Sequence, residues 1–289
     1  MRPKAKSGRQ TTRSLSVAIQ GERGAFSELA VRSLFGSRAR IVPCPDFEKM
    51  FRAAETGRAR FALAPIENTI AGSIHRVHDL LLDSPLRVVG EAIVRVAHHL
   101  IALPGVKLRQ IRRVYSHPVA LAQCEDFFRR HAHLTRVATH DTAGSVRLLS
   151  EEGAHDLAAI ASEPAARLYG ARIIKRHLED HRSNYTRFFL LSRRAKLSRR
   201  PNKTSVLFAT PHAPGALFRC MGVFALRDIN LTKIESRPLV GRPWEYVFHV
   251  DFEGSEDEER CRNALRHLRE VCHFVRVLGS YPKARTPRS

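Results

Sequence analysis

The residues best suited to chemistry lie in segment 184–189, Asn-Tyr-Thr-Arg-Phe-Phe, which follows a polar loop and opens an apolar strand. An arginine can bind a carboxylate through two parallel N–H donors, which makes Arg187 a candidate clamp for an acidic substrate. The hydroxyl of Thr186 can donate a hydrogen bond to a leaving oxygen. An exposed arginine in an ordinary loop explains the pair as well, so both interpretations stay open.

Five polar clusters stand where strand-like runs end and helices are expected to begin. In open α/β sheets, ligands gather at the carboxyl ends of strands. Helix N-termini there offer free N–H groups and a positive dipole end to an anion. Plain capping by Ser, Thr, Asn and Asp is the competing explanation for each cluster. The clusters are residues 21–27, 67–69, 116–118, 141–142 and 162–164.

The first two thirds of the chain alternate strand and helix patterns, which predicts an α/β fold. Periodicity indicates helices at 26–34, 47–56, 73–82, 118–130, 141–150 and 163–169. Apolar runs indicate strands at 15–20, 59–66, 113–116, 135–139, 157–162, 171–178 and 187–192, and residues 86–103 are extended. We expect a two-lobed, periplasmic-binding-protein-like body spanning 15–192. One lobe takes about 15–95 plus 179–192, and the other takes 96–178.

The pattern changes after a polar, basic linker at 193–203. A strand at 204–210 and a helix at 215–228 are followed by two strands, 230–239 and 244–252, joined across 240–243. A helix at 256–272 and a strand at 274–281 complete the order βαββαβ. This order predicts a ferredoxin-like domain at 204–282, with tails at 1–14 and 283–289.

The net charge of +21 suggests nucleic acid at first sight. The basic, acid-free segments 1–15, 193–203 and 281–289 hold much of the excess, and the rest of the chain carries +7. Attraction of anionic ligands explains that better, and we expect neither nucleic-acid nor membrane partners. Five cysteines without a CxxC pair indicate neither a disulfide scaffold nor a zinc site. The N-terminus lacks the apolar core of a secretory signal, and we expect a cytoplasmic protein; a plastid location stays open, since this basic segment could be a transit peptide.

Motifs along the chain resemble those of prephenate dehydratases and the related arogenate dehydratases, from about residue 16 to 282. One departure is Phe26, where the family often has tyrosine. Segment 72–82 is closer to the arogenate-type enzymes, which leaves the substrate open. The matching segments, in family order, are 21–28, 65–69 with 72–74, 116–118 with 120–124, 141–144, 159–162 and 184–188, and in the last domain 215–217 and 235–238.

The resemblance implies a lyase that converts prephenate to phenylpyruvate, water and carbon dioxide, or arogenate to L-phenylalanine, with no cofactor and no metal. Thr186 then donates to the departing hydroxyl. Ser116 as a plain helix cap and Gln123 as a structural residue are alternatives. The implied catalytic residues are Thr186, Arg187, Asn68, Ser116 and Gln123, and the implied substrate-binding residues are Glu67, Thr69, Ser27, Thr142 and Phe188.

The last domain resembles the family's ACT regulatory domain, which implies L-phenylalanine as effector and a homodimer or homotetramer. A purely structural dimerisation module is the alternative for this domain. For the two lobes, the alternative of another class is a non-catalytic anion- or solute-binding protein. The implied effector-binding residues are Gly215, Ala216, Leu217, Glu235, Ser236, Arg237 and Pro238.

Overall fold

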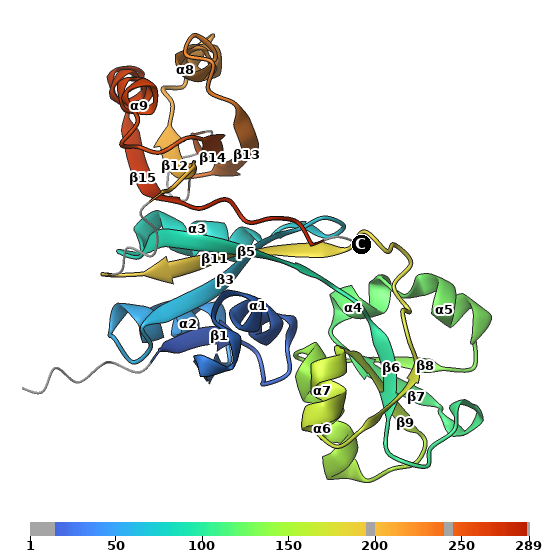
Figure 1. Cartoon of the computed structure of the whole chain (residues 1–289). Coiled ribbons are helices and arrows are strands. Elements are labelled where there is room, and N and C mark those ends of the chain that lie inside the picture. Colours follow the sequence, from blue (N-terminus) through green and yellow to red (C-terminus); the bar gives the residue numbers. More distant parts are fainter. Residues whose placement is uncertain (1–14, 195–199, 240–244, 288–289) are drawn as a thin grey trace, which may run out of the picture.

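The computed structural model describes residues 15–194, 200–239 and 245–287, which form three sheets with their helices (Figure 1). The expected N-terminal tail, residues 195–199 of the expected linker and the turn at 240–243 lie outside these ranges. Among the described residues, none of the helices combines the length and apolar character needed to cross a membrane. Two sheets form the two-lobed α/β body, and the third forms a C-terminal domain, as the sequence predicted.

The first lobe is a sheet of order β2-β1-β3-β11-β5, with the short β4 beside β3. Strand β11 returns from the end of the second lobe and lies antiparallel between β3 and β5. Strand β2 was not predicted, because its proline and arginine interrupt its apolar pattern. The elements are β1 (Ser16–Gln20), α1 (Phe26–Phe35), β2 (Arg40–Cys44), α2 (Phe47–Glu55), β3 (Phe61–Asn68), β4 (Gly72–Ser73), α3 (His75–Asp83), β5 (Arg87–Arg95) and β11 (Tyr185–Ser192).

The second lobe is a sheet of order β10-β6-β9-β7-β8, reached through the extended segment after β5. The single helix predicted at 118–130 is two, because Asp180 accepts hydrogen bonds from the backbone N–H groups of Glu125 and Asp126 and starts a new helix there. The elements are β6 (His99–Ala102), β7 (Arg113–Ser116), α4 (Pro118–Ala122), α5 (Glu125–Arg130), β8 (Thr135–Ala138), α6 (Thr142–Glu152), β9 (Leu157–Ala161), α7 (Glu163–Leu168) and β10 (Arg172–Lys175).

The C-terminal domain has the predicted order βαββαβ, and its antiparallel sheet runs β13-β14-β12-β15. This is the ferredoxin-like arrangement. Lys203 was expected to end the linker, but it begins the first strand of this domain. The elements are β12 (Lys203–Ala209), α8 (Ala216–Ala225), β13 (Leu231–Pro238), β14 (Tyr246–Glu253), α9 (Glu259–Val271) and β15 (Phe274–Tyr281).

The C-terminal domain packs on the first lobe through a continuous apolar core (Figure 1). Phe189 of β11 and Tyr281 of β15 belong to this core, and their ring centroids lie 5.8 Å apart. At Gly279 the backbone of β15 approaches β5 so closely that a Cβ atom would lie 2.1 Å from the carbonyl oxygen of Val88. The two domains therefore share one hydrophobic interior.

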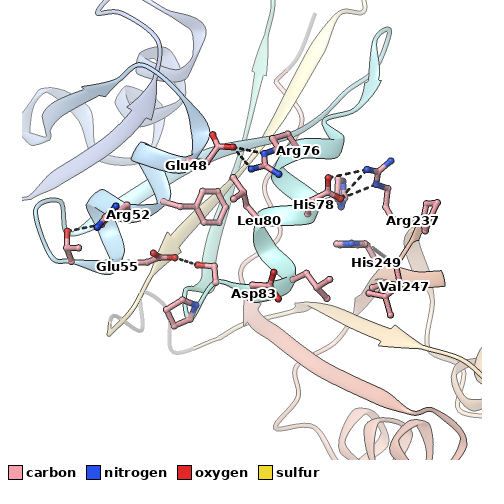
Figure 2. A pocket seen from close by; sticks show the side chains of 18 residues that line it. Glu48, Arg52, Glu55, Arg76, His78, Leu80, Asp83, Arg237, Val247 and His249 are labelled. Atoms are coloured by element: carbon pink, nitrogen blue, oxygen red, sulfur yellow. Dashed lines mark hydrogen bonds and ion pairs between the residues drawn. The ribbon is translucent and has the colours of Figure 1, made fainter. Parts of the chain in front are cut away.

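A groove of about 970 Å³ opens beside this core, between α2, α3 and the C-terminal sheet (Figure 2). The ion pair of Arg237 with Asp79 crosses the groove at 3.1 Å. Deeper in, the rings of His78 and His249 meet edge to face, with centroids 4.4 Å apart. Burial, with the nearby positive charge of Lys233, lowers the pKa of His78 to about 3. Burial likewise lowers the pKa of His249 to about 3. Both imidazoles are therefore neutral near pH 7.

This pair should contribute to the acid limb of stability. Because each folded-state pKa lies below the unfolded value of about 6.5, these two histidines take up two protons on unfolding between about pH 6 and pH 4. The stabilisation is complete above the unfolded pKa and is lost as pH falls, at about 2.7 kcal/mol per pH unit for the pair.

We expect His78→Gln to reduce the measured slope by about 1.4 kcal/mol per pH unit, the share of one proton. Urea unfolding at closely spaced pH values measures it. The exposed His155→Gln is the control and should leave the slope unchanged. An unaltered slope in His78→Gln would show that this histidine does not titrate on unfolding.

Candidate active site

Thr186 and Asn68 form the centre of a polar network at the junction of the two lobes. They lie directly opposite each other in the β11–β3 ladder. The Asn68 Nδ2 atom donates to the Thr186 Oγ1 atom at 3.0 Å. Both side chains keep partial contact with solvent. Thr186 accepts this hydrogen bond, so its own O–H proton is left to point at another acceptor.

The orientation of the Asn68 amide is set by the backbone. Its Oδ1 atom accepts from the N–H groups of Ile70 at 3.0 Å and Ala71 at 2.8 Å, in the loop that follows β3. An oxygen must therefore face that loop, and the NH₂ group must face β11. The Asn68 NH₂ group therefore donates to the Thr186 oxygen. The hydroxyl proton of Thr186 is then directed toward the space between the lobes.

The network continues from the first lobe into the second. Asn184 accepts from Asn68 at 2.7 Å and donates to the Gln123 Oε1 atom at 2.9 Å. His98 Nε2 lies 3.0 Å from the same oxygen, so it carries the proton, and its Nδ1 atom has no hydrogen-bond partner in the described part of the chain. Burial lowers the pKa of His98, so the ring is neutral. Asn68 and Gln123, both predicted, therefore join the two lobes through hydrogen bonds.

The lobes also meet at the loop that follows β1. The Ser162 hydroxyl, at the start of α7, donates to the carbonyl oxygen of Gly24 at 2.5 Å. A Cβ atom on Gly24 would lie 2.8 Å from Cα of Ala165, and the φ of +85° also favours glycine there. Two of the predicted polar clusters, 21–27 and 162–164, are thus brought together across the lobes, and their backbone contact requires glycine.

A cavity of about 330 Å³ lies between α1, α7 and the segment that joins β5 to β6. Phe26 lines it and packs edge to face on His98, with centroids 5.6 Å apart, so the cavity adjoins the network. Arg95 also lines it; its Nε atom is buried without a hydrogen-bond partner among the described residues, and Glu179 lies 3.8 Å from its Nη2 atom. The sequence analysis missed Arg95, because an arginine that ends an apolar strand has no local mark of function.

Arg187 is not placed to bind a substrate carboxylate, and this expectation was wrong. Successive residues of a strand point to opposite faces, so Arg187 points away from the face of Thr186 and toward the C-terminal domain. Its side chain is 9% exposed and pairs with Glu67 at 2.7 Å, with Glu91 at 3.1 Å and with Asp251. The Glu67 Oε2 atom also accepts a hydrogen bond from Lys233 Nζ at 2.6 Å. Glu67 was expected to bind substrate, but its carboxylate is engaged at the domain interface.

Other expected residues serve the fold. The fully buried Ser116 donates to the carbonyl oxygen of Ile160 at 2.6 Å, which removes its proton from any substrate. Phe188 is 2% exposed in the core beneath α1, and not in a substrate pocket as predicted. Thr69 holds the turn before β11 by donating to Ser183 O at 2.9 Å. Ser27 is buried in α1, whereas Thr142 begins α6 and keeps partial exposure.

The two segments predicted to bind an effector lie toward the same end of the strands of the C-terminal sheet. Strands β12 and β13 are both antiparallel to β14, and Val247 pairs with Ala209 of one and Arg237 of the other. The start of α8, at Gly215 with φ +73°, therefore lies toward the same end of the sheet as the end of β13. Ala216 is buried and Leu217 exposed. The β13 residues alternate: Glu235 and Arg237 face the first lobe, while Ser236 and Pro238 are exposed.

Comparison with known proteins agrees with this architecture. A curated arogenate dehydratase/prephenate dehydratase of Arabidopsis thaliana is 46% identical, covering 97% of this chain and 77% of the relative. An arogenate dehydratase of Petunia hybrida is 44% identical over 93% of this chain and 72% of the relative.

Two solved structures share the fold of this chain. A prephenate dehydratase of Arthrobacter aurescens in complex with L-Phe superposes with a TM-score of 0.85 at 33% identity, covering 93% of this chain and 90% of that one. A protein described as a novel type of quorum quenching acylase superposes with a TM-score of 0.84 at 36% identity, covering 92% and 97%.

The family model for prephenate dehydratase matches residues 17–196, which include both lobes and the Thr186 network. With the relatives that match over nearly the whole chain, this match shows that the chain belongs to the prephenate dehydratase family.

Proposed function

We propose that the protein is a dehydratase that removes water and carbon dioxide from prephenate, giving phenylpyruvate for phenylalanine biosynthesis. The observation that carries the proposal is the Thr186 hydroxyl. It accepts from Asn68 at the junction of the two lobes, and none of the described residues accepts its proton. A positioned donor of this kind stabilises charge that develops on a leaving oxygen.

The reaction needs one proton and no electron acceptor. The bond between the ring and its carboxylate breaks, the electron pair enters the ring, and the opposite C–O bond breaks as the ring becomes aromatic. The departing hydroxide takes up one proton and leaves as water. Thr186 is a weak acid, so its role is to hold and hydrogen-bond the departing oxygen, with the proton drawn ultimately from solvent.

Arg95 is the cation that we assign to a substrate carboxylate. It lines the cavity beside the Thr186 network, and its buried Nε atom lacks a partner there. A charged fork matches a carboxylate in geometry and charge. Arogenate, with an amine in place of the keto oxygen, is the alternative substrate, since the two plant relatives bear that name. Parallel assays with both compounds decide between them.

A solute-binding protein without turnover is the competing function for a two-lobed body. The oriented threonine hydroxyl favours the enzyme, because binding alone does not require a free donor at that point. Formation of phenylpyruvate, followed by its absorbance in alkali, supports the proposal. Saturable binding of both compounds without product would support the receptor instead.

The C-terminal domain is proposed to act as an ACT-type regulatory domain that binds L-phenylalanine between subunits. The related structure from Arthrobacter aurescens is a complex with L-Phe. Among the described residues of this domain, six large apolar side chains are exposed, which suits association of copies into a homodimer or a homotetramer. They are Leu217, Phe218, Leu226, Ile234, Tyr246 and Phe274. A cytoplasmic location stays a prediction from the sequence.

Thr186→Ala should lower kcat about 100-fold, because one hydrogen bond to a charged oxygen is lost in the transition state. Thr186→Ser should stay within about tenfold of the wild type, since the hydroxyl remains. Initial rates of phenylpyruvate formation measure both. A folded Thr186→Ala variant within threefold of the wild type would exclude Thr186 as the donor.

Arg95→Gln should raise KM for the dianionic substrate by about 10- to 100-fold, the expected effect of losing a charge-assisted hydrogen bond of about 1.5–3 kcal/mol. Arg167→Gln at the exposed rim of the same cavity is the matched control and should change KM less than threefold. Equal effects of the two substitutions would argue against a specific contact with Arg95.

L-phenylalanine should bind the intact protein and change the apparent affinity for substrate by about 5- to 150-fold, the range of ordinary coupling between sites. Because such coupling is reciprocal, an unreactive substrate analogue should change the affinity for phenylalanine by the same factor. Titration calorimetry in both orders measures this. No heat of binding at millimolar phenylalanine would contradict the regulatory assignment.

A further inference from the structure

Two neighbouring cross-strand pairs in the β11–β3 ladder point in opposite directions. Asn68 faces Thr186, and one step further along the ladder Glu67 faces Arg187. The first pair belongs to the network between the lobes, with 3.0 Å between Nδ2 and Oγ1. The second pair, with 2.7 Å between Nη1 and Oε1, lies against the C-terminal domain. The dipeptides Glu67-Asn68 and Thr186-Arg187 therefore each contribute one residue to the catalytic face and one to the domain interface.

The interface side is a cluster of six charges, four of them buried and two (Glu67 and Lys233) partly exposed, defined here as the interdomain charge cluster. Lobe one supplies Glu67, Glu91 and Arg187, and the C-terminal domain supplies Lys203, Lys233 and Asp251. Three acids balance three bases. The charges pair across the domain boundary, as when Lys203 lies 3.1 Å from Glu91 and Lys233 lies 2.6 Å from Glu67.

Asp251 is the member that ties Arg187 to the C-terminal sheet. It lies on β14, it is 4% exposed, and one of its oxygens binds the Nη2 atom of Arg187. Its other oxygen accepts from the hydroxyl of Ser205, which lies 2.6 Å from the hydroxyl of Tyr281. Burial opposes the charge, yet Arg187 and Lys203 hold the pKa of Asp251 below its usual range. The carboxylate is thus ionised and held by two strands of its own domain.

A buried ion pair resists separation, because each partner would remain as an uncompensated charge. A shift of the C-terminal sheet against lobe one must therefore move Arg187 or break the cluster. Arg187 is covalently next to Thr186, and Glu67 is next to Asn68. The ladder register also shifts between Arg187 and Phe188, a bulge of the kind that re-aims side chains beside sites.

We propose that Arg187 and Glu67 are positioning residues, through which the C-terminal domain, by way of Asp251, sets the position of Thr186 and Asn68 relative to the substrate. The inference rests on the proposed dehydratase function. It assigns the route by which an effector bound to the C-terminal domain changes turnover. A shift of β14 moves Arg187 and its partner Glu67. Because these residues adjoin Thr186 and Asn68 in the ladder, the two polar side chains then move out of position for the substrate.

Asp251→Asn tests the route, because it removes one charge and keeps the size of the side chain. We expect kcat to fall at least tenfold while KM stays within threefold, since Arg95 is untouched. The response of turnover to saturating L-phenylalanine should shrink at least threefold, although calorimetry still detects binding. Combined with Thr186→Ala, the substitution should lower kcat by less than threefold more, because both act through one hydroxyl.

Glu256→Gln is the control. It breaks an exposed ion pair with Arg87 across the same boundary, at 2.7 Å, and should leave kcat and the phenylalanine response unchanged. Should Asp251→Asn fail to fold, Ser205→Ala frees the same carboxylate from its hydrogen bond while keeping every charge, and it should give an intermediate loss of kcat.

Folded variants with kcat within twofold of the wild type and an unchanged response would overturn the inference. So would fully multiplicative losses with Thr186→Ala. An absence of turnover by the wild-type protein with either substrate would instead overturn the proposed function, and this inference with it.

Discussion

The positive charge of Arg187, buried between two domains, is the constraint on which much of this structure depends. Its guanidinium is compensated by Glu67, Glu91 and Asp251, and the extra acidic charge requires two lysines from the C-terminal domain. Loss of one partner from a buried pair costs about 3–5 kcal/mol, which is a large part of a domain's stability. The C-terminal domain is therefore held in a defined position on lobe one by charge as well as by the shared apolar core.

The same strand turns its other face toward the candidate active site. Strand alternation puts Thr186 toward the second lobe, and the backbone N–H groups of Ile70 and Ala71 dictate which end of the Asn68 amide meets it. Two backbone N–H groups in a loop therefore orient the Asn68 amide, and the amide in turn orients the hydroxyl proton of Thr186. The hydrogen bonds continue into the second lobe through Asn184, Gln123 and His98. The network therefore depends on the relative position of the two lobes.

Much of the fold followed from the sequence because its elements are strongly periodic. Continuous apolar runs became buried strands, and the split βαβ order of the last domain was visible in the change of pattern after residue 203. Strand β2 was missed because Arg40 and Pro43 break its apolar run. The break between α4 and α5 was missed because Asp180, which is distant in sequence, makes it.

The residues of the candidate site were predicted in part. Thr186, Asn68 and Gln123 were chosen from motifs, and the structure brings them together. Arg187 was misplaced because its neighbour in sequence was taken as its neighbour in space, although the period of two along a strand separates them. No local pattern marks Arg95, whose importance comes from the cavity that α1 and α7 form around it. Charge pairing between distant strands likewise leaves no trace in a single sequence.

A crystal structure with an unreactive analogue that keeps the ring hydroxyl and both carboxylates tests this account most directly. The account predicts the ring hydroxyl within hydrogen-bond distance of the Thr186 Oγ1 atom, and a carboxylate on Arg95. It also predicts Arg187 still bound to Asp251 behind the strand. A carboxylate of the analogue bound to Arg187, with its contact to Asp251 broken, would contradict the account.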